Sequence, residues 1–115
     1  MRREFDVTQK AIPVRVQLSR KAGWRMPENT VKVDRTTLFG NPFTIEGARR
    51  AGFEGDDTEI SAMCAGWFRN SMQKDLPATR AIRKRLPELR GKNLACWCAI
   101  GSACHADTLL ELANE

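Results

Sequence analysis

Three cysteines, the only histidine and an aspartate lie within one short segment near the carboxyl end of this 115-residue sequence. The segment reads Cys96-Trp-Cys98-Ala-Ile-Gly-Ser-Ala-Cys104-His105-Ala-Asp107. A thiolate is a nucleophile, an imidazole can act as a general base, and both are metal ligands. Because the chain has one histidine and no tyrosine, any mechanism that needs two imidazoles within one chain is excluded. This segment is therefore the first candidate for a functional site.

The segment predicts a strand, a glycine-containing loop and a helix, in that order. The apolar run 93–98 is typical of a buried strand, and residues 104–114 have the apolar spacing of a helix. In α/β folds, ligands collect at the carboxyl ends of strands, and a helix N-terminus attracts anions. The same position lowers the pKa of a thiol and favours a neutral imidazole, which applies to Cys104 and His105. Asp107 could cap the helix or hold the imidazole.

The candidate catalytic residues are therefore Cys98, Cys104, His105 and Asp107. Side chains of neighbouring residues at a helix start diverge, so we expect Cys98 rather than Cys104 to pair with His105 as nucleophile and base. Purely structural cysteines are the competing interpretation. At the helix start we also expect an anion such as phosphate, with Arg20 or Arg25 as the opposing cation.

Zinc on Cys96, Cys98, Cys104 and His105 is the lesser alternative. Side chains two residues apart on one strand face are separated by roughly 6.5–7 Å. Sulfurs around one zinc ion must approach to about 4 Å. The strand would have to bend, and adjacent cysteine and histidine residues rarely share an ion. No cofactor and no metal site is therefore predicted.

Alternating apolar residues predict two further short strands, at 14–18 and 31–33. The loop between them, 19–30, is long for a hairpin and rich in functional groups, which is typical of a binding loop. It contains Trp24 and Arg25, which could stack on a base and clamp a phosphate or, equally, cover the sheet edge.

Two helices are predicted between these strands and the Cys-His segment. Asp56 and Glu59 have the spacing of a capping box, and the residues that follow them place one apolar face on a helix. Cys64 lies on that face and is expected to be inert core. A shorter helix should begin near Pro77, and Pro87 should end or kink it.

The expected fold class is α/β, a small sheet in the order ββααβα covered by helices, with the functional strand–loop–helix near the C-terminus. Residues 1–12 are expected to be a flexible tail and 13–115 a single domain. The chain has no apolar run long enough to span a membrane and no signal-peptide pattern, so the expected location is cytoplasmic.

Five ordered motifs in this chain resemble the domain-of-unknown-function family numbered 4326, which is common in phages and bacteria. The motifs are Gly23-Trp-Arg-Met-Pro27, Gly40-Asn-Pro-Phe43, Leu89-Arg-Gly-Lys92, Leu94-Ala-Cys-Trp-Cys98 and Cys104-His-Ala-Asp107 with the helix after it. The chain departs from the family at Phe39, where tryptophan is usual, and at Ala99, where proline is usual. The last motif is more distantly similar to the family numbered 488. The resemblance implies that the Trp24–Arg25 loop, the Asn41 turn and the Cys-His loop belong to one site.

We therefore expect a domain that binds a phosphate-bearing ligand, such as a nucleotide, nucleoside or nucleotide-sugar, and that acts on it through its Cys-His site. Arg20, Trp24, Arg25 and Asn41 are the expected ligand-binding residues. The net charge of +5 attracts phosphates. The same charge also fits an alternative function, a non-catalytic basic module that binds nucleic acid or a host protein. Residues 69–92, however, lack the aromatic side chains that binding of single-stranded nucleic acid needs.

Overall fold

Residues 12–115 are described by the computed structural model, which places three short strands and several helices in one α/β fold. This confirms the predicted fold class and element order. The predicted tail, residues 1–12, lies outside the described residues except for Ile12. Within 12–115, no helix combines the length and the apolar character needed to cross a bilayer.

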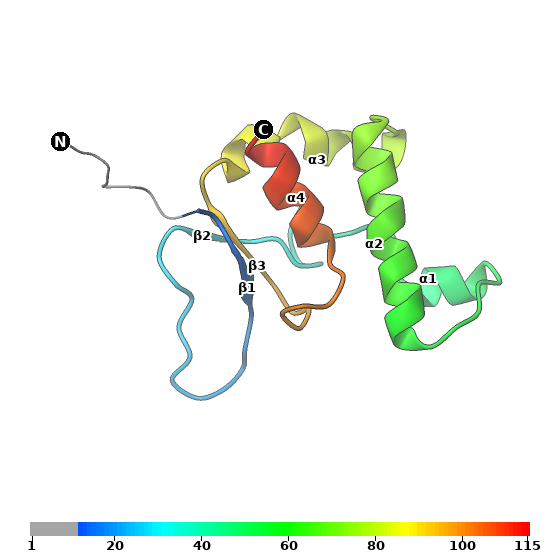
Figure 1. Cartoon of the computed structure of the whole chain (residues 1–115), viewed down its shortest axis with the longest axis horizontal. Coiled ribbons are helices and arrows are strands. Elements are labelled where there is room, and N and C mark those ends of the chain that lie inside the picture. The colour runs from blue at the N-terminus through cyan, green and yellow to red at the C-terminus, as the bar shows by residue number, and fades with distance from the viewer. Residues whose placement is uncertain (1–11) are drawn as a thin grey trace.

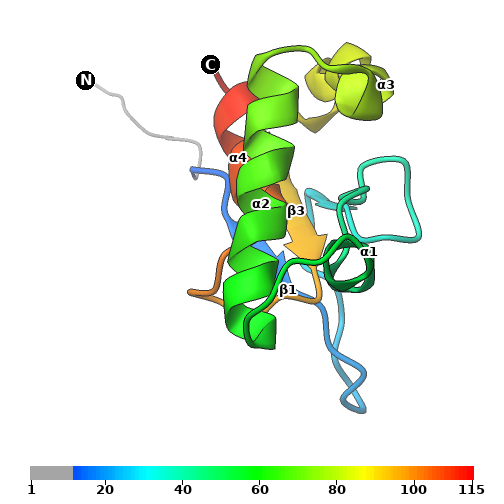
Figure 2. The ribbon, with the colours of Figure 1, turned by 90° about the vertical axis from the view of Figure 1, so that its right-hand side faces the viewer.

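The sheet is parallel, with β3 (Asn93–Cys96) between β1 (Arg15–Gln17) and β2 (Thr30–Lys32). The central strand buries Leu94, Ala95 and Cys96, as expected for a strand with a neighbour on each side. The long predicted loop joins β1 to β2, but these two strands each pair with β3 and not with each other. It is therefore a connection between two strands on opposite sides of β3, and it extends away from the helices (Figures 1 and 2).

The longest helix, α2 (Asp57–Gln73), begins at the predicted capping box. The backbone N–H of Glu59 donates to the Asp56 carboxylate at 2.8 Å, and the Glu59 carboxylate accepts from the Asp56 N–H at 2.9 Å. Before α2, the short helix α1 (Ile45–Arg50) is capped by the Thr44 hydroxyl. Two helix starts are thus fixed by side-chain bonds that satisfy otherwise unpaired N–H groups.

The region around the predicted second helix is divided into three short pieces. A 3₁₀ turn, η1 (Pro77–Thr79), leads into α3 (Arg80–Lys84), and a second 3₁₀ turn, η2 (Leu86–Leu89), follows. Pro87 lies inside η2, and proline cannot donate the hydrogen bond that an α-helix needs there. The residue before it also avoids the α conformation. The helix therefore stops at Lys84.

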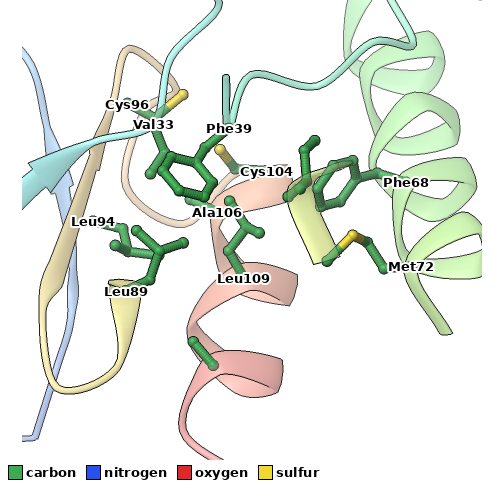
Figure 3. Close-up of a cluster of buried hydrophobic side chains, with 12 residues drawn as sticks. Val33, Phe39, Phe68, Met72, Leu89, Leu94, Cys96, Cys104, Ala106 and Leu109 are labelled. Atoms are coloured by element: carbon green, nitrogen blue, oxygen red, sulfur yellow. The ribbon is translucent and has the colours of Figure 1, made fainter. Parts of the chain in front are cut away.

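The last helix, α4 (His105–Ala113), packs against β1 and β3 on one side and against α2 on the other. Figure 1 shows α4 between the sheet and α2, with α1 beyond α2. The main core lies along this line, with Leu94 from the sheet, Leu109 from α4 and Phe68 from α2 fully buried (Figure 3). Cys96 and Cys104 belong to the same core, so the candidate site is built into its edge.

We expect Asp56→Ala to lower the free energy of unfolding by about 0.5–2 kcal/mol, because it removes the cap of α2. Urea unfolding followed by circular dichroism measures this change. Glu59→Gln should cost less, since glutamine can still accept from the Asp56 N–H. The control Thr58→Ala changes an exposed neighbour for which the structure shows no capping bond. An equal loss in Thr58→Ala and Asp56→Ala would contradict the capping role.

Candidate functional site

The cysteine–histidine cluster, defined as Cys96, Cys98, Cys104 and His105, lies where β3 ends and α4 begins. The strand stops at Cys96, and the chain bends at Trp97 and Cys98. Gly101, with φ of 94°, adopts a backbone conformation that side chains rarely allow, and it turns the loop back. The chain then reaches Cys104 in an extended conformation, directly before the first turn of α4.

Three of the four side chains of the cluster converge on one point, and the fourth, Cys98, lies next to Cys96. The sulfurs of Cys96 and Cys104 and a ring nitrogen of His105 lie within 4.8 Å of one another, and all three residues are buried. The Cys98 sulfur is 3.8 Å from that of Cys96, and the Cys104 sulfur is 3.7 Å from Nδ1 of His105. Cys98 is the partly exposed member.

Two expectations about this segment were wrong. Cys96 and Cys98 approach each other because the strand ends and bends between them, so the spacing of an extended strand does not apply. His105 pairs with Cys104 and not with Cys98. Cys104 is extended while His105 is the first helical residue, and this change of backbone conformation turns adjacent side chains toward each other.

The imidazole of His105 is held in one orientation. Its Nε2 lies 2.8 Å from the carbonyl oxygen of Val33, the residue after β2. A carbonyl can only accept, so Nε2 carries the proton and, in a neutral ring, Nδ1 presents its lone pair to the cysteines. The ring also packs edge-on against Phe68 of α2, with 5.2 Å between ring centroids. Asp107, which we expected to hold the imidazole or cap the helix, does neither.

A buried arginine, which the sequence analysis missed, lies beside the cluster. The Arg15 side chain is only 7% exposed, and its Nη2 donates to the carbonyl of Ala99 at 2.7 Å. Its Nη1 makes no hydrogen bond within the described part of the chain and lies 3.8 Å from the Asp107 carboxylate. In the sequence, Arg15 is a polar position in a strand of alternating apolar residues. That pattern predicts that its side chain lies on the solvent-facing side of the strand.

The cysteines of the cluster share their protons unequally. The neighbouring Cys96 and Cys98 thiols lower the pKa of Cys104 to about 3, with help from the Ala106 N–H and the Arg15 guanidinium and against the effect of burial. The pKa of Cys98 is raised far above its ordinary value, first because its proton is bonded to Cys104 and then because of Cys96 and burial. Of the cluster thiols, Cys104 is therefore the one whose surroundings favour the deprotonated form.

A cavity of about 450 Å³ opens beside the cluster at the carboxyl edge of the sheet. Its walls are the cluster itself, the segment after β2, the start of α1 and the middle of α2. The polar side chains on these walls, apart from the cluster, are Asp34, Arg35, Thr36, Asn41 and Ser61. Ligands of α/β folds are commonly bound at this edge.

Of the four predicted ligand-binding residues, only Asn41 lines this cavity. Its side chain already accepts from the Phe43 N–H at 2.9 Å and donates to the Cys64 carbonyl at 3.2 Å, so it ties the loop to α2. Gly40 before it is packed so closely that a Cβ atom there would meet the Arg35 backbone at 2.7 Å. The Gly-Asn motif thus shapes the cavity wall.

The other predicted ligand-binding residues lie in or near the long loop. Trp24 and Arg25 are not among the residues that line the cavity. Arg20 lies over the ring of Trp97, 4.2 Å from its centroid, in a cation–π contact at the cavity rim. Trp97 itself is 38% exposed.

Asp34 holds the Trp97 side of the cavity in place. Its buried carboxylate accepts from the indole N–H of Trp97 at 2.9 Å and from the Thr36 hydroxyl and N–H at 2.6 and 3.1 Å. Lys32 is 3.7 Å away. Burial alone would raise the pKa of Asp34, but the Thr36 and Trp97 bonds and the Lys32 charge together lower it. The ionised form is therefore the one that fits this site.

The basic residues of the α3 region are largely occupied by partners within the chain. Arg85 pairs with Glu88 at 2.6 Å, Arg80 donates to the Asp75 carbonyl at 2.8 Å, and Arg83 donates to the carbonyl of Met72. This surface therefore offers fewer free cations than the sequence suggests.

A three-stranded parallel sheet with a buried cysteine–histidine cluster and a ligand-sized cavity at its carboxyl edge defines a small α/β domain with one candidate site. The chain belongs to the family described as Domain of unknown function (DUF4326), whose model matches residues 16–115. This confirms the family suggested by the sequence motifs. No curated protein and no solved structure matches the chain.

We expect Asp34→Asn to lower the free energy of unfolding by about 1.5–3 kcal/mol near pH 7, because it removes bonds to an ionised group. The pKa of Asp34 is lowered from its ordinary value of 3.8 in the folded state. Its stabilising effect is therefore present above that value and is lost as the pH falls below it and through the lower folded pKa. The difference between Asp34→Asn and wild type should shrink at about pH 3.

Urea unfolding of both proteins at pH 7 and pH 3 measures this difference. Glu54→Gln serves as the control, because it removes a carboxylate from an exposed position. A difference for Asp34→Asn that stays constant with pH would show that the charge of Asp34 is not what stabilises the Trp97 side of the cavity.

Proposed function

We propose that this domain binds a phosphate-bearing small molecule, of the size of a mononucleotide, in the cavity beside the cysteine–histidine cluster. The observation that carries the proposal is a cavity at the carboxyl edge of a parallel sheet, lined by thiols, an imidazole, hydroxyls and one arginine. Its volume of about 450 Å³ lies in the range typical of small-molecule sites.

The balance of charges around the cavity favours an anionic ligand. Asp34 is paired with Lys32, and Arg15 lies beside Cys104, whose pKa it helps to lower. Arg35 lines the cavity and forms no ion pair with another residue of 12–115. Burial raises the pKa of the Cys64 thiol, which lines the same cavity, and the Arg35 charge partly opposes this effect. Arg35 is thus the cation on the cavity wall that is available to a ligand.

The remaining walls suit the other parts of a nucleotide-like molecule. The hydroxyls of Thr36 and Ser61 can bond phosphate or sugar oxygens, and Phe43 and Trp97 supply aromatic surface. Arg20, on the Trp97 ring, adds a second positive charge at the rim. The Cys98 sulfur, the least buried of the cluster, lines the cavity and is the thiol that such a ligand would meet.

The alternative of a basic module for nucleic acid has less support. The guanidinium groups of the α3 region that would contact phosphates are bonded to acidic or carbonyl groups of the same chain. The structure shows no aromatic side chain within that region on which bases could stack.

Binding can be measured by titrating the ¹⁵N-labelled chain with AMP, adenosine and inorganic phosphate. We expect AMP to shift the amide signals of residues 34–36, 61–65 and 96–105, and adenosine to bind more weakly. Arg35→Gln should weaken AMP binding about 10-fold or more, because a hydrogen bond to a charged group contributes about 1.5–3 kcal/mol. Added salt should weaken binding as well.

The matched control is Lys84→Gln, which removes the same charge from an exposed position on α3. Arg25→Gln separately tests whether the long loop takes part. If Arg35→Gln and Lys84→Gln weaken AMP binding equally, binding reflects net charge alone. Shifts confined to 80–92 would place the ligand on the basic surface and contradict the proposal.

A further inference from the structure

We propose that the cysteine–histidine cluster is a mononuclear metal site that takes one divalent ion of the zinc class. Its four ligands are the sulfurs of Cys96, Cys98 and Cys104 and the Nδ1 atom of His105. This inference stands on the geometry of the cluster and does not depend on a ligand in the neighbouring cavity.

Two separations within the cluster match those of a tetrahedral site. With Zn–S near 2.3 Å, two sulfurs on one ion are about 3.8 Å apart, and a sulfur and an imidazole nitrogen about 3.6 Å. The Cys96 and Cys98 sulfurs are 3.8 Å apart, and the Cys104 sulfur and Nδ1 of His105 are 3.7 Å apart. Two hydrogen-bonded pairs would satisfy these distances separately, but the sulfurs of Cys96 and Cys104 also lie within 4.8 Å of each other. Three of the four donors, from Cys96, Cys104 and His105, thus surround one position, and the fourth, the Cys98 sulfur, lies next to that of Cys96.

The second bond of His105 is the one that metal-binding histidines usually make. A ligating imidazole commonly donates its other N–H to a carbonyl or carboxylate, which fixes the ring and its tautomer. Nε2 of His105 donates to the Val33 carbonyl at 2.8 Å, so Nδ1 is the atom left with a lone pair facing the sulfurs. The Phe68 ring packed against the imidazole excludes water from this side.

Arg15 supplies the charge that such a site requires. Three thiolates and one divalent ion carry a net charge of −1, and a buried negative charge is costly without a partner. The Arg15 side chain is more than nine-tenths buried, and its Nη1 has no hydrogen bond within the described residues. A metal-bound Cys104 thiolate beside it would compensate this buried cation.

Binding involves no redox change. The ion forms four coordinate bonds, and each ligating thiol that is still protonated releases its proton to the solvent. A disulfide between Cys96 and Cys98 is the competing use of two of these sulfurs. It would need an oxidant and a sulfur separation near 2.05 Å, against 3.8 Å here.

The site is tested on the full chain, purified under reducing conditions without a metal-binding tag. Elemental analysis should find about one zinc per chain. The cobalt(II)-loaded protein should show the intense visible absorption of a tetrahedral thiolate site. Metal loading of the apoprotein should release protons into a weakly buffered solution.

The variants Cys104→Ser and His105→Gln should lose the ion on dialysis against a chelator. Cys98→Ser is the most informative of the ligand variants, because Cys98 is the partly exposed ligand and its loss is least damaging to the core. Cys98→His should retain the metal with a shifted cobalt spectrum. Cys64→Ala is the matched control, since this buried thiol lines the same cavity outside the cluster, and it should keep its zinc.

Arg15→Gln should weaken metal affinity about 10–100-fold, the usual effect of removing a group that supports the ligands. Wild-type protein that is folded and reduced, but neither contains zinc nor gives the cobalt spectrum, overturns the proposal. So does iron with inorganic sulfide, or unchanged metal content in Cys104→Ser. Arg35→Gln should keep its zinc while losing AMP, so failure of the metal site and failure of the ligand site are separate results.

Discussion

The hydrogen bond from His105 to the carbonyl of Val33 connects the parts of the fold on which the site depends. Through it, the first residue of α4 is fixed to the chain leaving β2, while the same ring packs against α2 through Phe68. Because the donor and acceptor are both buried, an unpaired partner would be costly, and the three elements are held in one relative position. The cluster and the cavity are built on either side of this fixed ring.

The elements were predictable from sequence wherever a local interaction determines them. The Asp56–Glu59 capping box and the apolar face after it define α2, and the apolar run 93–98 indicated the strand that the structure places at Asn93–Cys96. The parallel pairing of β1 and β2 on either side of β3 was not predictable in this way. It depends on contacts between residues far apart in the sequence, and alternation within a strand of three residues does not indicate which strand pairs with which.

The residue types indicated the segment in which the cysteine–histidine cluster lies, but they did not indicate the geometry of that cluster. The distance argument against zinc assumed that the strand continues through Cys98, whereas it ends at Cys96. The argument against a Cys104–His105 pair assumed that both residues are helical, whereas only His105 is. Both errors come from differences of one or two residues in where an element begins or ends, which is the part of secondary structure that local sequence determines least. Arg15 was missed because strand alternation alone does not show that its side chain is buried.

The two arginines near the site, Arg15 and Arg35, have different environments. Each environment suits a different kind of anion. Arg15 is buried beside Cys104, so its charge balances a permanent negative group within the protein. Arg35 is solvent-exposed on the wall of the cavity, where a ligand can arrive and leave without unfolding the chain. A buried charge must always be compensated, so it requires a fixed partner group. An exposed charge can be hydrated when no ligand is bound, so it can pair with an exchangeable ligand. This arrangement is consistent with a constant metal–thiolate centre that forms the wall of a cavity for an exchangeable anion.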